Sequence, residues 1–96
     1  MVSSRERWDE IYKRKGVEVG VDKGDFIVAI SEEKAYALSP AVYYIWSLCD
    51  GETSIGTIVE NLMQNLGSEV NIEDVYKAVI TIIDKLAEVD LIEKVK

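Results

Sequence analysis

The sequence predicts an α+β fold in which three antiparallel strands come first and three helices follow. From Val17 to Leu38 the apolar residues recur with the period of a strand, and turn residues interrupt them twice. From Ser39 onward they recur every three or four positions, as in amphipathic helices. The chain has 96 residues, which is enough for one hydrophobic core.

Residues 1–16 are predicted to be an N-terminal arm or a short helix. Ser3 followed by Glu6 fits a capping box. Trp8, Ile11 and Tyr12 would share one face at helical spacing. We therefore expect a helix over residues 3–15 that either docks on the core or stays apart, and a separate domain over residues 17–96.

The three strands are predicted from alternation and turns. In residues 17–21, three valines alternate with a glutamate and a glycine, as in a half-buried strand. Turn residues 22–24 lead to a second strand over residues 26–30. Residues 31–33 lead to a third over residues 34–38. Strands joined by such short turns form an antiparallel meander.

The first helix has a sharp predicted start. Ser39 is a good N-cap, and Pro40 suits the first helical position because its missing N–H is not needed there. Trp46 and Cys49 belong to its apolar stripe, and Gly51 is expected to end it. We expect Trp46 to fill the core.

The second and third helices follow the same logic. The second begins near Thr53 or Ser54 and ends at Gly67, with regular apolar spacing between. The third begins after Asn71, a good N-cap, and its apolar stripe is wider than one packing face needs. Exposed apolar area costs about 25 cal/mol per Å², so this helix is either covered on both sides or offers a second contact surface. Residues 91–92 are expected to fold back onto the core.

The composition argues against catalysis by this chain. There is no histidine, and a single cysteine, Cys49, lies in an apolar stretch where a thiol usually behaves as a small buried hydrophobe. We expect no catalytic residue, no metal site and no cofactor. The apolar runs are too short for a membrane helix, and residues 1–7 lack the apolar stretch of a signal peptide, so a cytoplasmic location is expected.

The charge disfavours nucleic-acid binding. Eleven Lys and Arg against eighteen Asp and Glu give a formal net charge of −7, and a polyanion would repel such a chain. The one basic cluster is interleaved with Glu6, Asp9 and Glu10, which is typical of a solvated helix face. That cluster consists of Arg5, Arg7, Lys13, Arg14 and Lys15.

The block from Tyr36 to Thr53 carries a family resemblance. It reads Tyr36-Ala37-Leu38-Ser39-Pro40, then Ile45-Trp46, then Leu48-Cys49-Asp50-Gly51-Glu52-Thr53. This resembles the PqqD-like family of precursor-peptide recognition domains, whose typical pattern is leucine, asparagine or serine, proline, an apolar–tryptophan pair and leucine-cysteine-aspartate-glycine. The resemblance extends from Val17 to about Ile92. It implies a winged-helix-like domain in which the strands precede the helices.

The resemblance also implies a function. In that family a leader peptide adds as a strand beside the third strand, against the third helix, and the domain presents it to a modifying enzyme, often a radical S-adenosylmethionine enzyme. The implied strand residues here are Lys34, Ala35, Tyr36, Ala37 and Leu38, and the implied pocket walls are Val75, Tyr76, Val79, Ile80 and Ile83. Lys34 would attract an acidic residue of the leader.

Two alternatives stay open. The exposed strand and the third helix would also suit a homo-oligomeric interaction module, so the chain is expected to be a monomer or a homodimer. A winged-helix DNA-binding protein is disfavoured by the acidic charge and by the absence of a hairpin after the third helix. Whether the pathway makes pyrroloquinoline quinone or another product is not decided by the sequence.

Overall fold

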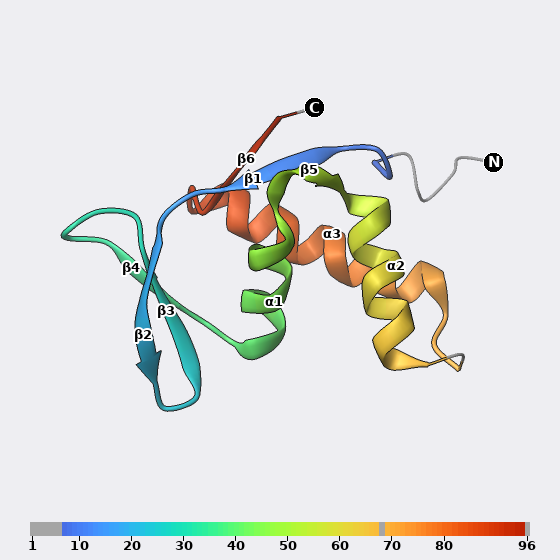
Figure 1. Cartoon of the computed structure of the whole chain (residues 1–96), viewed down its shortest axis with the longest axis horizontal. Helices are drawn as coiled ribbons and strands as arrows, with labels where there is room; N and C mark the ends of the chain where they lie inside the picture. Colours follow the sequence, from blue (N-terminus) through green and yellow to red (C-terminus); the bar gives the residue numbers. More distant parts are fainter. Residues whose placement is uncertain (1–6, 68, 96) are drawn as a thin grey trace.

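The computed structural model describes residues 7–67 and 69–95, and Figure 1 shows their arrangement. The elements in this part of the chain are, in order, β1 (Ile11–Arg14), β2 (Val17–Asp22), β3 (Asp25–Ala29), β4 (Ala35–Leu38), α1 (Pro40–Leu48), β5 (Asp50–Ser54), α2 (Ile55–Leu66), α3 (Ile72–Glu88) and β6 (Ile92–Lys94). The predicted α+β class, with three helices and antiparallel sheets, is confirmed. The strands form two sheets instead of the single one that the sequence predicted.

The strands β2, β3 and β4 form the predicted meander, in that spatial order. Val28 of β3 lies opposite Tyr36 of β4, and the face that carries them packs toward α1, with Val28 fully buried. The sequence predicted that the alternating valines of β2 form the buried side of the strand, and this is wrong. Glu18 faces α1 and accepts a hydrogen bond of 2.6 Å from the Tyr43 hydroxyl.

The three valines of β2 are therefore exposed. Val17, Val19 and Val21 keep 66%, 62% and 61% of their surface in solvent. Val17 lies opposite Ala29, and Ala29 lies opposite Ala35, so Val17 is on the outer face of the sheet together with these two alanines. A bulge at Val19 and the edge position of β2 shift the alternation. Alternation of apolar and polar residues predicts that the two faces of a strand differ, but it does not predict which face is turned to the core.

The predicted helix starts are confirmed by their caps. The Ser39 hydroxyl accepts a hydrogen bond from the Val42 N–H at 3.4 Å, and Ser54 caps α2 through the Thr57 N–H at 3.2 Å. Asn71 caps α3 in the same way. Side-chain oxygens at these positions satisfy N–H groups that have no partner within the helix.

A second sheet was not predicted. It has the order β5-β1-β6, with Ile11 opposite Ser54 and Arg14 opposite Ile92. The helix predicted over residues 3–15 is thus wrong for Ile11–Arg14, which form the central strand; Ser3 and Glu6, the expected capping box, lie outside the described residues. Local helical spacing was outweighed here by hydrogen bonds to two strands that are distant in the sequence.

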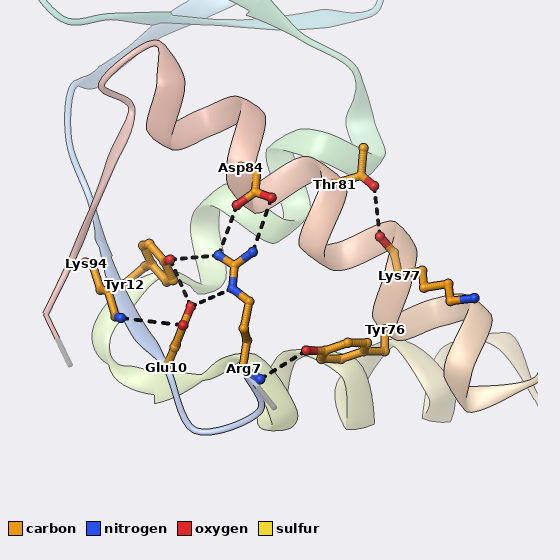
Figure 2. Close-up of polar contacts among 8 residues, drawn as sticks. All are labelled: Arg7, Glu10, Tyr12, Tyr76, Lys77, Thr81, Asp84 and Lys94. Atoms are coloured by element: carbon orange, nitrogen blue, oxygen red, sulfur yellow. Dashed lines mark hydrogen bonds and ion pairs between the residues drawn. The ribbon is translucent and has the colours of Figure 1, made fainter. Parts of the chain in front are cut away.

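A polar network fastens the N-terminal segment to α3 (Figure 2). The Arg7 guanidinium bonds the Glu10 carboxylate through Nε at 3.0 Å and the Asp84 carboxylate through Nη2 at 2.9 Å. It also donates to the Tyr12 hydroxyl at 3.0 Å. The Arg7 backbone N–H donates to the Tyr76 hydroxyl at 3.1 Å. The sequence predicted that Arg7 lies on a solvated helix face. This prediction is wrong, because Arg7 bonds side chains of its own segment and of α3.

Glu10→Gln is expected to lower the free energy of unfolding by about 1–2 kcal/mol near neutral pH, because it removes a charged acceptor. Burial raises the pKa of Glu10, but hydrogen bonds from Arg7 and Tyr12 and the charges of Arg7 and Lys94 outweigh it and hold that pKa below its usual 4.5. A carboxylate with a lowered pKa contributes stability above its unfolded pKa and loses it as the pH falls through the folded pKa.

Urea denaturation of wild type and Glu10→Gln at several pH values checks this. The difference in unfolding free energy should be constant from about pH 7 to about pH 5.5. It should shrink below about pH 4.5, because the unfolded carboxylate then takes up a proton while the folded carboxylate, with its lower pKa, stays ionised until the pH falls further. An equal difference at about pH 3 would contradict the role of the charge.

Trp46 is a core residue, as predicted, and it bonds two carbonyls from opposite ends of the chain. Its indole N–H donates to the Leu91 carbonyl at 3.0 Å and to the Lys15 carbonyl at 3.3 Å. The Arg14 guanidinium lies 5.8 Å from the ring centroid, within range of a cation–π contact. Leu91 and Ile92 are buried to 0% and 2% exposure, which confirms their predicted return to the core. None of the described helices is long and apolar enough to cross a membrane.

Candidate functional site: a groove beside the free edge of β4

The strand β4 pairs on one side only. It is the last strand in the order β2-β3-β4, and its register sets Ala35 opposite Ala29 and Ala37 opposite Ile27. The Ile30 N–H donates to the Lys34 carbonyl at 2.9 Å. Since hydrogen-bonded pairs alternate along an antiparallel ladder, the N–H and C=O groups of Ala35 and Ala37 point to the free edge.

An apolar groove lies directly beside this edge, between β4 and α3. Its volume is about 330 Å³, at the lower end of the roughly 300–1,000 Å³ typical of ligand pockets. Tyr36 and Leu38 enter it because they occupy the face of β4 that is turned toward the helices. The lining residues are Tyr36, Ala37, Leu38, Val42, Thr81, Ile82, Lys85, Leu86, Val89 and Leu91.

The strand half of the sequence-predicted site falls at this groove. Tyr36, Ala37 and Leu38 line it. Ala35 is exposed at the same edge, and Lys34 is exposed just before the strand. An incoming strand would therefore meet the backbone of β4 and the side chains of Tyr36 and Leu38 together.

The helix half of the predicted site falls elsewhere. Val75, Tyr76, Val79 and Ile83 are core residues with 5% exposure or less, and they do not line this groove. Tyr76 instead stacks on Trp8, with ring centroids 6.0 Å apart. Ile80 is partly buried against the core and is also outside the groove.

The wall that α3 gives to the groove comes from the flank of its apolar stripe. Ile82, Leu86 and Val89 recur there at helical spacing, and Thr81 and Lys85 lie beside them. The helix residues predicted from the sequence lie at the centre of the stripe, which packs into the core. Val89, seven residues after Ile82, lies on the same side of the helix, and this spacing could have indicated the flank from the sequence. The centre of the wide stripe is covered by the core, and Ile82 and Val89 on its flank are half-buried; that this flank is a second contact surface stays a prediction.

The block that carries the resemblance has structural roles. Cys49 is fully buried; burial, with the charge of Asp50, raises the pKa of its thiol to about 12, so the thiol is protonated near neutral pH. The N–H groups of Glu52 and Thr53 bond the Asp50 carboxylate and lower its pKa. Gly51 has φ of 85°, a conformation that favours glycine. Among the described residues, no three His, Cys, Asp or Glu side chains gather as a metal site would require.

Comparison with known families identifies one family for most of the chain. The family model described as coenzyme PQQ synthesis protein D (PqqD) matches residues 26–92, from β3 to the start of β6. The match leaves out β1 and β2. Comparisons with curated proteins and with solved structures give no match. Because the family match spans well over half of the sequence, the chain belongs to the PqqD family, coenzyme PQQ synthesis protein D.

Proposed function

We propose that this chain is a non-catalytic peptide-binding protein that captures the leader of a ribosomally made precursor and presents it to a modifying enzyme. The observation that carries the proposal is the free edge of β4 beside an apolar groove. Membership in a family named for coenzyme PQQ synthesis supports a biosynthetic role for the chain.

The edge suits strand addition. A peptide that lies antiparallel or parallel to β4 satisfies the backbone groups of Ala35 and Ala37, which gives affinity without particular side chains. Alternate side chains of the peptide then point into the groove between Tyr36 and Ile82. The groove thus sets the preference for apolar residues at every second position.

The other edge of the sheet is less suitable. Strand β2 contains a bulge between Glu18 and Gly20, and bulges twist an edge away from regular pairing. The groove beside β4 is not lined by any residue of β2. We therefore assign the peptide to β4.

Charge at the groove favours an acidic leader. Lys85 lines the groove, and Lys34 is exposed at the start of β4. A carboxylate of the peptide next to either ammonium group would gain attraction that weakens with salt. The chemistry on the captured precursor belongs to the partner enzyme, for which a radical S-adenosylmethionine enzyme and a cytoplasmic location remain predictions.

Ala37→Pro is expected to weaken peptide binding at least about tenfold, which corresponds to about 1.4 kcal/mol. The substitution removes an N–H that points to the edge, so the β3–β4 ladder keeps its hydrogen bonds and the fold should persist. Titration of ¹⁵N-labelled protein with precursor peptides encoded near its gene measures the affinity. Ala37→Ser is the matched control because it keeps the donor.

The same titration tests the location. Amide signals of residues 34–38 and of residues 81–89 should shift on binding, since they flank the groove. If these signals stay unchanged with every such precursor, or if Ala37→Pro binds as tightly as Ala37→Ser, the proposal is wrong.

A second candidate function is pairing with another copy of the chain. The outer face of the meander favours it, because Val17, Ile27, Ala29, Ala35 and Ala37 share that face by register. Sedimentation at several concentrations separates the two functions, since a self-assembling module changes mass with concentration and a monomeric peptide binder does not.

A further inference from the structure

We infer that the peptide is held at two places, with a second apolar anchor in a hollow between α1, α2 and α3. This rests on the proposed function, because the anchor is an extension of the peptide that binds β4. The hollow has a volume of about 360 Å³ and is lined mainly by aliphatic side chains, among them Leu62, Leu66, Val75 and Val79. Leu66 keeps 56% of its surface exposed, although it belongs to the apolar stripe of α2.

The hollow and the β4 groove adjoin along α3. Ile82 lines both of them. On α1, Val42 lines the groove and its neighbour Ala41 lines the hollow, so the first turn of α1 separates the two. A chain that leaves β4 beside Val42 therefore reaches the hollow by crossing Ile82.

The length of the path fits a short peptide. The residues of α3 that line the two cavities run from Asp74 to Val89, which is about 22 Å at about 1.5 Å per residue. An extended chain covers about 3.3 Å per residue, so roughly seven residues span both cavities. The apolar anchor should follow the strand-forming segment within that length.

The charges at the two ends give the peptide a direction. Lys85 lines the groove and Asp74 lines the hollow. Among residues 7–67 and 69–95, neither takes part in an ion pair. The structure therefore favours a peptide with an acidic residue near β4 and a basic residue near the anchor. Each cavity is at the small end of the range for ligand sites, about 300–1,000 Å³, as expected for single side chains of a peptide.

Selection and titration with defined peptides test this. Random peptides long enough to span both cavities are displayed and selected on the immobilised wild-type protein, and enriched sequences are synthesised with and without their second apolar residue. The titrations compare Ala78→Gln with Lys77→Gln. Ala78 lines the hollow and Lys77 does not, while both are exposed on α3, so the pair places the same side chain inside and outside the site.

The expected result is that Ala78→Gln weakens binding of the two-anchor peptide at least about tenfold, that Lys77→Gln does not, and that both bind the shortened peptide equally. If the peptide depends on Ala37 but binds both α3 variants equally, the second anchor is refuted and the proposed function survives. If no sequence is enriched, both are refuted. If Ala78→Gln instead dissociates a dimer of the free protein, the hollow holds a second copy and the inference fails.

Discussion

Tyr12→Ala is expected to destabilise the fold by about 3–5 kcal/mol, as large aromatic truncations in cores do. Tyr12 lies in the central strand of the second sheet and is only 7% exposed. Its hydroxyl donates to Glu10 and accepts from Arg7, both at 3.0 Å. Truncation therefore removes core packing and breaks the network that joins the N-terminal segment to α3. Because small domains have unfolding free energies of about 5–15 kcal/mol, much of the stability would be lost.

Tyr12→Phe is the matched control for this prediction. It keeps the ring and removes only the hydroxyl, so the loss should be about 1 kcal/mol. Urea denaturation followed by Trp fluorescence measures both variants. If Tyr12→Ala costs no more than Tyr12→Phe, then β1 is not part of the cooperative core.

Gly56→Ala is expected to destabilise the wild-type protein by about 1–3 kcal/mol, the usual cost of overpacking. A Cβ atom at Gly56 would overlap the Trp8 indole. The close approach is fixed by the backbone, because the Gly56 N–H donates to the Trp8 carbonyl at 2.8 Å and the Ile55 N–H donates to the Glu10 carbonyl at 2.9 Å. These two carbonyls satisfy N–H groups at the start of α2.

The effect of Gly56→Ala on stability should change sign when the Trp8 indole is removed. In the Trp8→Ala background, Gly56→Ala is expected to stabilise the protein by up to about 1 kcal/mol, since alanine has the higher helix propensity. A double-mutant cycle by thermal and urea denaturation isolates this coupling. An equal effect of Gly56→Ala in both backgrounds would show that Trp8 does not lie on Gly56 in solution.

The parts of the fold that the sequence predicted well have local causes. Ser39, Ser54 and Asn71 are N-caps because a side-chain oxygen bonds an N–H two or three residues later. The meander β2–β4 follows from short turns that join neighbouring strands. Such interactions lie within a few residues and are visible in the sequence.

The parts that were missed depend on contacts between distant residues. Ile11–Arg14 form a strand because β5 and β6 lie on either side of them, and no local pattern announces partners that begin some 40 and 80 residues later in the chain. Val17 of β2 was placed on the wrong face because alternation does not say which side the helices will cover.

The candidate site also has one part that depends on neighbouring residues and one part that depends on contacts between distant residues. The sequence by itself determined the strand that borders the groove, Ala35–Leu38, and the helix cap at Ser39, because both depend on neighbouring residues. Only the tertiary structure decided which flank of α3 faces β4. Packing buried Val79 and Ile83 and left Ile82, Lys85 and Val89 along the groove. A helix with a wide apolar stripe can be rotated in several ways at similar local cost, and the choice is made by the elements that cover its other sides.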